Sequence, residues 1–231
     1  MPGSEFTSGS GRGLFATKLV ENYLESKRAE PIADEPAKLG VIHSWVRAIS
    51  ALKSTELGSE QKFNQDIRGR VLGYVPYPPT PDSFSSLWHK PPSSVTGIRK
   101  TPDGILGVFA TGIESQILAV IELKKPGTNL DAPQPSHENK SPVAQAFEYG
   151  STIIGVRWVI VTDMREVRLY AIDSDSEYEA FALERCVDKG GQATEELRRL
   201  HFILHHDHLV RGALQSSTAR LHSKSATRQL E

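Results

Sequence analysis

The chain has 231 residues, which is enough for one globular domain with a substantial core but not for two domains of ordinary size plus its polar segments. Its formal net charge of -1 gives no overall attraction to nucleic acid, so any basic surface must be local. One cysteine, Cys186, excludes an internal disulfide framework and a four-cysteine zinc site. The sequence has no apolar run of about 20 residues and no apolar signal-peptide core, so we expect a cytoplasmic protein with no membrane association.

The two ends of the sequence differ in composition from its centre. Residues 1–13 are rich in glycine and serine and are interpreted as a cloning linker or a disordered segment. Residues 216–231 are polar and lack an apolar stripe, as expected of a tail or an interdomain linker. We therefore predict a single domain over residues 14–215.

The first part of that domain is predicted to be helical. Two amphipathic helices are indicated by apolar residues at helical spacing: Leu19, Val20, Tyr23 and Leu24, then Leu39, Ile42, Val46 and Ile49. A third helix is predicted to begin at Ser59 as its N-cap and to end near Gly73, with Phe63, Ile67 and Val71 along its buried stripe.

The middle of the chain is predicted to hold a hairpin between two polar loops. Prolines and serines over residues 75–92 predict a long loop. Residues 104–109 and 116–123 are short apolar runs joined by a Thr-Gly turn, which is typical of a β-hairpin. Residues 125–140 form the second polar loop.

The last third is predicted to alternate between helix and strand. Ser141 as N-cap and Pro142 at the first helical position indicate a helix to about Ile154. Three strands and a last helix follow: 158–162, then 167–171 with Arg168 and Tyr170 on a wetter face, an edge strand over 178–183, and a helix capped by Thr194 that contains Leu197, Leu200, Leu204 and Leu209. This order predicts an α/β fold, a central mixed β-sheet flanked by helices.

Three acidic residues lie at positions where a globular domain disfavours charge. Asp103 directly precedes the first hairpin strand, and Glu122 ends the apolar run of the second, so both carboxylates are expected at one end of the sheet. Glu60 lies on the apolar stripe of the third helix and is expected to point inward. Gathered carboxylates repel one another unless a cation compensates, and Mg²⁺ or Mn²⁺ prefers such oxygen ligands.

A lysine completes this acidic set. Lys124 follows Glu122 by two residues, so in a strand both side chains emerge on the same face. A divalent ion polarises a phosphodiester and lowers the pKa of bound water, and a lysine at that water can orient or deprotonate it. The spacing therefore favours phosphodiester hydrolysis.

These residues resemble a known motif. Pro102 and Asp103, followed by Glu122, Leu123 and Lys124, look like the signature of the PD-(D/E)XK nuclease superfamily. Superfamily members also use a glutamate from an earlier helix, a role that Glu60 matches.

The next helix extends the resemblance to one branch of the superfamily. Gln145 and Tyr149 are similar to the Gln-x-x-x-Tyr element of the RecB-like nucleases. The stretch over residues 121–149 especially resembles the N-terminal nuclease domain of type I and type IIG restriction-modification enzymes.

The resemblance implies a restriction-endonuclease-like core and a Mg²⁺-dependent endonuclease that cuts double-stranded DNA, with Mn²⁺ able to substitute. It also implies a methyltransferase or helicase and a target-recognition domain elsewhere in a full-length protein. Because one active site cuts one strand at a time, double-strand cleavage implies a transient dimer or two encounters.

The resemblance implies a role for each site residue. Asp103, Glu122 and the backbone carbonyl of Leu123 would bind the metal, and Glu60 would hold a metal-bound water or a second ion. Lys124 would act on the attacking water. Two further sets would assist: Gln145 and Tyr149 would orient Lys124 or the scissile phosphate, and Lys125 would bind phosphate.

Other interpretations stay open at this point. Asp66 shares the helix of Glu60, and Glu60 could merely favour the positive end of the helix dipole. Tyr149 could be an ordinary core aromatic. His201 and His205 share a helix face but lack the glutamate of a His-Glu-x-x-His zinc motif, so a half-solvated face is favoured. At the level of function, a non-catalytic DNA-binding module with the nuclease fold and a nuclease acting on RNA or free DNA ends are the alternatives.

Overall fold

The computed structural model describes residues 14, 22, 25, 31–51, 56–78, 85–97, 100–110 and 114–210. The terminal segments over 1–13 and 216–231 lie outside the described residues, as does nearly all of the helix predicted around residues 19–24.

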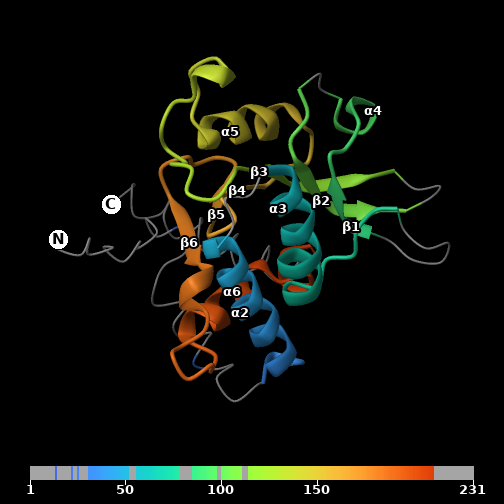
Figure 1. Ribbon diagram of the computed structural model, residues 1–231. Helices are drawn as coiled ribbons and strands as arrows, with labels where there is room; N and C mark the ends of the chain where they lie inside the picture. Colours follow the sequence, from blue (N-terminus) through green and yellow to red (C-terminus); the bar gives the residue numbers. More distant parts are fainter. Residues whose placement is uncertain are drawn as a thin grey trace, which may run out of the picture.

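One six-stranded sheet forms the centre of the molecule, with its strands in sequence order. The strands are β1 (Ser85–His89), β2 (Gly104–Phe109), β3 (Gln116–Leu123), β4 (Trp158–Thr162), β5 (Glu166–Ala171) and β6 (Tyr178–Ala182). Only β3 and β4 are parallel; the other neighbours are antiparallel. The predicted α/β fold with a central mixed sheet flanked by helices is confirmed (Figure 1).

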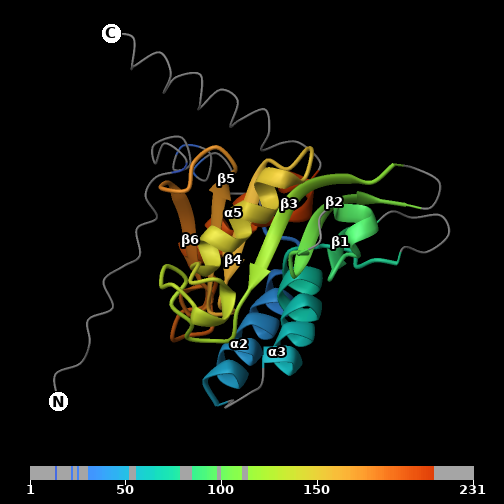
Figure 2. The same ribbon diagram turned by 90° about the horizontal axis from the view of Figure 1, so that it is seen from above.

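Helices cover both faces of this sheet. They are α2 (Glu35–Ala51), α3 (Glu56–Phe63), the π-helix η1 (Asn64–Val71), α4 (Ser93–Thr96), α5 (Pro142–Thr152), α6 (Glu195–Leu204) and α7 (His206–Leu209), with short 3-10 turns η2 (Pro135–His137) and η3 (Leu183–Arg185). Helix α5 lies on one face, whereas α2, α3 and α6 lie on the other (Figures 1 and 2). None of the described helices is long and apolar enough to span a membrane.

Strand β3 shows why the sheet has two cores. Ala119, Ile121 and Leu123 are buried in the larger core, on the side of α2 and α6. Val120 points the opposite way, into the smaller core beneath α5. Successive side chains of a strand alternate between faces, so a strand covered on both sides reads as an unbroken apolar run. Glu122 and Lys124 follow Val120 in this alternation and therefore emerge on the α5 face.

The hairpin of β2 and β3 has the predicted bounds and a defined register. Gly104 pairs with Ile121, and the register shifts between Leu106 and Gly107. A Cβ atom on Gly107 would lie 1.8 Å from the carbonyl oxygen of Gln116, so only glycine fits at this irregularity. The register fixes which residues meet where the two strands end.

Helix α5 connects the two parallel strands and begins as predicted. The Ser141 hydroxyl accepts a hydrogen bond from the backbone N–H of Ala144 at 3.1 Å, and Pro142 occupies the first turn. Gly150 lets the helix approach the sheet, because a Cβ there would lie 2.8 Å from Cδ1 of Ile172. Close packing of α5 fixes the side chains that it directs toward the end of β3.

The third predicted helix is partly wrong in its start and in its type. It begins at Glu56, so Ser59 is an interior helical residue and not the N-cap. After Phe63 it continues as the π-helix η1. The predicted stripe of Phe63, Ile67 and Val71 is nevertheless buried. Apolar spacing locates the buried face but does not reveal the extra residue of a π-turn.

The predicted loop over residues 75–92 is wrong where it includes β1. This strand pairs with β2 at the edge of the sheet. Two buried serines replace the usual apolar signature, and both are hydrogen-bonded: the Ser85 hydroxyl donates to the Pro76 carbonyl at 2.9 Å, and the Ser86 hydroxyl accepts from the Val75 N–H at 3.1 Å. Both serines can be buried because each hydroxyl is hydrogen-bonded, although their polarity did not indicate a buried strand in the sequence.

Two later predictions also need correction. The helix capped by Thr194 ends before His205, whose extended backbone separates α6 from α7, so Leu209 belongs to α7. Tyr170 was predicted on a wetter face of β5 but is buried, with its ring 5.5 Å from that of Phe147. Helix α5 covers this face, which alternation along β5 alone could not indicate.

Candidate active site

Asp103 and Glu122 meet at one end of the sheet. Because Gly104 pairs with Ile121, the antiparallel register places Asp103 beside Glu122. The backbone N–H of Leu123 donates a hydrogen bond to Oδ2 of Asp103 at 2.8 Å. This bond ties the residue before β2 to the last residue of β3.

Lys124 is buried next to these carboxylates. Its Nζ lies 2.6 Å from Oε1 of Glu122 and donates to Oε1 of Gln145 at 3.3 Å. Its backbone N–H donates to the carbonyl of Thr162 at 2.8 Å, which extends the pairing of β3 with β4. An ammonium in a dry environment is costly unless it is paired. Glu122 and Gln145 supply that pairing and fix the position of the amine.

Gln145 is itself held by its second amide atom. Its Nε2 donates to Oε1 of Gln134 at 3.4 Å and to the carbonyl of Lys140 at 3.3 Å. The side chain is buried at the start of α5. These contacts turn Oε1 of Gln145 toward Lys124, so the segment 125–140 contributes indirectly to the position of the amine.

Glu60 points inward from α3, as predicted. It is buried, with Oε1 2.7 Å from Nε2 of His89 and Oε2 3.3 Å from Nζ of Lys90. Burial alone would raise the pKa of Glu60, but the hydrogen bond from His89 and the charges of His89 and Lys90 outweigh it and lower the pKa. The group is thus an ionised carboxylate held at the end of β1.

Two observations bear on the alternative interpretations of Glu60. Asp66 is engaged within its own helix by Lys62 and by Arg70, whose Nη1 lies 3.3 Å from Oδ1. Glu60 lies in the second turn of α3, because the helix begins at Glu56, so a dipole at the first turn does not account for its inward position.

Burial and the surrounding charges shift the pKa of Asp103. Burial is the largest influence and raises its pKa, and the negative charge of Glu60 acts in the same direction. The Leu123 N–H and the charges of Lys124 and Lys90 act oppositely but do not overcome burial, so the pKa stays above its usual value. Asp103 therefore interacts electrostatically with groups from α3 and from the ends of β1 and β3.

Tyr149 is half-buried and borders the same site. Burial, followed by the negative charges of Glu122 and Asp103, raises the pKa of its hydroxyl to about 12. The hydroxyl therefore stays protonated at neutral pH and is available as a hydrogen-bond donor. Its ring also packs against the core beneath α5, so the packing role and the proximity to the site coexist.

Lys125 lies just outside this group. Its side chain is exposed and, with Lys124, lines a hollow formed by the polar segment 125–140. The structure thus brings together Asp103, Glu122, Lys124, Gln145 and Tyr149, places Glu60 close enough to interact electrostatically with Asp103, and places Lys125 at the margin of the group.

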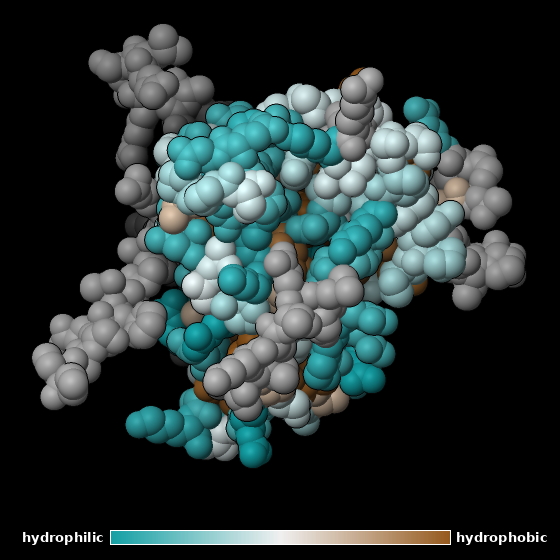
Figure 3. All heavy atoms as spheres, turned by 45° about the horizontal axis from the view of Figure 1, so that its top comes forward, coloured by the Kyte–Doolittle hydropathy of each residue, from teal (hydrophilic) through white to brown (hydrophobic). Residues whose placement is uncertain are grey.

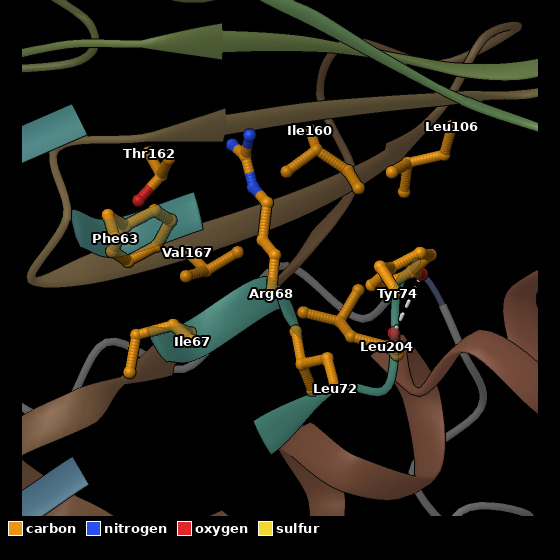
Figure 4. A pocket seen from close by; sticks show the side chains of 10 residues that line it. All are labelled: Phe63, Ile67, Arg68, Leu72, Tyr74, Leu106, Ile160, Thr162, Val167 and Leu204. Atoms are coloured by element: carbon orange, nitrogen blue, oxygen red, sulfur yellow. Dashed lines mark hydrogen bonds between the residues drawn. The ribbon is translucent and has the colours of Figure 1, made fainter. Parts of the chain in front are cut away.

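Arg68 is a buried cation that sequence reasoning missed. It extends from η1 toward β4, with its guanidinium between Thr162 and Ile160 (Figure 4). Its Nη1 donates to Oδ1 of Asn64 at 2.6 Å, and no described residue accepts a hydrogen bond from Nη2. Burial lowers its pKa to about 10, against the opposing charges of Asp103, Tyr74 and Glu60. A positive charge therefore lies behind the carboxylates.

Two features explain why Arg68, His89 and Lys90 were not predicted as part of the site. Arg68 is adjacent to the apolar stripe in the sequence, but the π-helical geometry of η1 turns it inward. His89 and Lys90 were missed because the segment around them was predicted to be a loop.

The donor chemistry of this site suits a hard cation. Carboxylates and a backbone carbonyl are the oxygen ligands that Mg²⁺ and Mn²⁺ prefer. Within the described residues, however, no group of three or more His, Cys, Asp or Glu side chains is arranged to hold a metal ion. Side chains of the protein occupy the carboxylates instead: Lys124 contacts Glu122, and Lys90 and the imidazole of His89 contact Glu60. A metal ion would have to exchange with these groups.

The histidines considered for zinc lie on α6 and just beyond it. The rings of His201 and His205 are stacked with centroids 4.3 Å apart, and Nζ of Lys38 lies 3.1 Å from Nε2 of His201. Burial, followed by nearby positive groups, lowers the pKa of His201 to about 3 and that of His205 to about 4. These are neutral rings packed beside an amine.

The chain matches no protein-family model, no curated protein and no solved structure. The resemblance to PD-(D/E)XK nucleases therefore rests on the residues and their spacing in this sequence.

Proposed function

We propose that the chain is a Mg²⁺-dependent DNA endonuclease domain of the PD-(D/E)XK type. The observation that carries this proposal is the position of Lys124, which is held between Glu122 and Gln145 at the end of the sheet that Asp103 and Glu60 also approach. A structural ion pair would need only one carboxylate, whereas this amine contacts Glu122 and also interacts electrostatically with Asp103.

A divalent ion, Mg²⁺ or Mn²⁺, would polarise the scissile phosphate and lower the pKa of a bound water. Asp103, Glu122 and the carbonyl of Leu123 would hold it. Glu60 would hold a bound water or a second ion after releasing His89 and Lys90. These are carboxylates that burial makes costly to leave without a cation.

The chain's other polar groups would position the reactants. Lys124 would orient the attacking water as an ammonium, or accept its proton after first losing one of its own to solvent, and Gln145 would keep the amine in place. The protonated hydroxyl of Tyr149 would donate a hydrogen bond to a phosphate oxygen. Lys125 would bind a neighbouring phosphate.

The biological setting is part of the proposal. Double-stranded DNA is the substrate, and a cytoplasmic restriction system is the setting in which such a domain acts. A methyltransferase or helicase and a target-recognition domain would supply the sequence specificity, and two copies would meet transiently to cut both strands.

The direct test is cleavage of a supercoiled plasmid with Mg²⁺ or Mn²⁺. We expect Lys124→Ala to lower the cleavage rate by about two to four orders of magnitude, the usual contribution of a positioned acid or base. Lys189→Ala, at an exposed lysine in another loop, should cleave like the unmodified chain. Equal rates for Lys124→Ala and the unmodified chain would refute the mechanism.

A non-catalytic DNA-binding module is the second candidate. It is favoured by the pairing of Glu122 with Lys124 and of Glu60 with His89, because these contacts balance charge without an added ion. Calorimetry separates the two: a nuclease should bind Mn²⁺ in a manner that Asp103→Asn abolishes. A panel of circular DNA, linear DNA and RNA tests the remaining alternatives, an enzyme acting on RNA or on free DNA ends.

A further inference from the structure

The polar segment 125–140 lines an open hollow beside the candidate active site. Its volume is about 440 Å³, within the range of ligand pockets. Its lining combines Lys124, Lys125 and His137 with hydroxyl and amide groups, among them those of Gln134 and Ser136, and includes no carboxylate. Polar groups and apolar atoms share its walls, and the surface around this segment is largely hydrophilic (Figure 3).

The hollow is built on a well-anchored segment. The backbone N–H of Gly127 donates to Oδ2 of Asp163 at 2.9 Å, and that of Gln134 donates to the carbonyl of Lys140 at 2.9 Å. Leu130 is buried in the core beneath α5. A binding site on this segment would need little reorganisation, which favours affinity.

The charges around the hollow favour an anion. Asp131 is turned to Arg168, whose Nη1 lies 2.9 and 3.0 Å from its two carboxylate oxygens, and Glu138 pairs with Lys100 and Lys140. The segment's two carboxylates are thus engaged outside the lining. No carboxylate among the described residues forms an ion pair with the ammonium of Lys125.

Two residues that line the hollow connect it to the candidate active site. Lys124 lines it directly. Gln134 lines it too and accepts the hydrogen bond from Gln145, the residue that contacts Lys124. An occupant would therefore lie next to the position where a scissile phosphate meets Lys124.

We propose that this hollow is a subsite for one nucleotide of the DNA strand, adjacent to the bond that is cleaved. Its phosphate lies against Lys125, and its sugar and base lie against the amide, hydroxyl and imidazole groups of Gln134, Ser136 and His137. The volume accommodates a whole nucleotide and not only an inorganic anion. This subsite rests on the proposed nuclease function, which it deepens.

Binding without cleavage tests the subsite. The full chain, isotopically labelled and held in EDTA, is titrated with 2′-deoxythymidine 5′-monophosphate, with inorganic phosphate and with a short DNA duplex while backbone amide resonances are followed. We expect all three to shift the amides of residues 127–137, with the nucleotide stronger than phosphate. Lys125→Ala should weaken nucleotide binding about tenfold, the effect of losing one charge-assisted hydrogen bond. The matched control, Lys189→Ala, should not.

The outcomes separate the subsite from the nuclease activity. Perturbations elsewhere, or binding that Lys125→Ala leaves unchanged, would overturn the subsite even if the plasmid is cut. Equal affinity for phosphate and the nucleotide would reduce it to a phosphate site and overturn the nucleotide assignment. A response to the mononucleotide but not to the duplex would overturn a strand subsite and indicate a free nucleotide as ligand. Selective binding without plasmid cleavage would instead refute the nuclease and leave a nucleotide-binding hollow.

Discussion

Oε1 of Gln145 lies 3.3 Å from Nζ of Lys124, and the opposite end of the same amide donates to Gln134 and to the Lys140 carbonyl. We expect Gln145→Ala to lower the single-turnover cleavage rate at least tenfold, since a hydrogen bond to a charged group is worth about 1.5–3 kcal/mol. Substrate affinity should change little, because Gln145 acts through Lys124. Gln192→Ala, at an exposed glutamine, is the control. A loss confined to DNA affinity would contradict the positioning role.

Asp103 links stability to pH. Its pKa is raised chiefly by burial, so the folded chain holds this proton more tightly than the unfolded chain does. Folding stability is therefore lost as pH rises from the ordinary aspartate pKa of about 4 through the raised folded value, and the loss persists above it. We expect Asp103→Asn to raise the Tm of the metal-free protein near neutral pH and to have no such effect in strong acid.

The same variant should respond differently to metal. Mn²⁺ should raise the Tm of the unmodified chain, because an ion that binds only the folded state stabilises it, and should not raise that of Asp103→Asn. Asp173→Asn, at an exposed aspartate, controls for loss of charge. A lower Tm for metal-free Asp103→Asn would show that the hydrogen bond to Leu123 outweighs the cost of burial.

Lys90 would compete with a metal ion for Glu60 if the proposed function holds. Its Nζ lies 3.3 Å from Oε2 of that carboxylate and is about half exposed. We expect Lys90→Ala to lower the Mg²⁺ concentration for half-maximal cleavage by about two- to fivefold at low ionic strength, because an exposed ion pair contributes at most about 1 kcal/mol. Lys189→Ala should leave the Mg²⁺ requirement unchanged. A higher requirement in Lys90→Ala would mean that the lysine holds Glu60 in its binding orientation.

Substitutions of Arg68 test whether its buried guanidinium stabilises the fold. Its Nη2 has no acceptor among the described residues, so the charge is poorly compensated. We expect Arg68→Met, which keeps much of the volume, to change the free energy of unfolding by less than about 1 kcal/mol or to raise it. Arg68→Ala should be about 2–4 kcal/mol less stable than Arg68→Met, because it leaves a cavity. Urea denaturation measures both; equal losses would show that the guanidinium itself is needed.

Two glycines should respond in opposite directions to the same substitution. At Gly107 a Cβ would meet the Gln116 carbonyl oxygen at 1.8 Å, whereas at Gly40 no atom lies within 4 Å. Gly107→Ala should lower the free energy of unfolding by more than about 2 kcal/mol, because backbone must move. Gly40→Ala should raise it by up to about 1 kcal/mol through helix propensity in α2. Similar effects of both changes would contradict the tight hairpin register.

The parts of the fold that were predictable are those with a strong local signal. Strands β2, β3 and β4 are apolar runs bounded by polar loops, and α5 begins with a side-chain cap and a proline. Asp103 and Glu122 were placed together because they flank the same hairpin. Local pattern and tertiary structure agree in these segments.

The parts that were not predictable depend on contacts distant in sequence or on a local departure from α-helical geometry. Strand β1 buries Ser85 and Ser86, which only their hydrogen-bond partners make tolerable. The inward orientation of Arg68 follows from the π-helix, and the ion pairs of Glu60 follow from the placement of β1 beside α3. Such features produce no periodic pattern of apolar residues in the sequence.

The ammonium and imidazole groups at Glu122 and Glu60 have a consequence for how the protein would be loaded. Because these carboxylates already have counterions from within the chain, the sheet can assemble without waiting for a divalent ion. Loading with a metal ion would then be an exchange of cations on a sheet that is already folded, governed by the ionic composition of the surroundings and not by a folding transition.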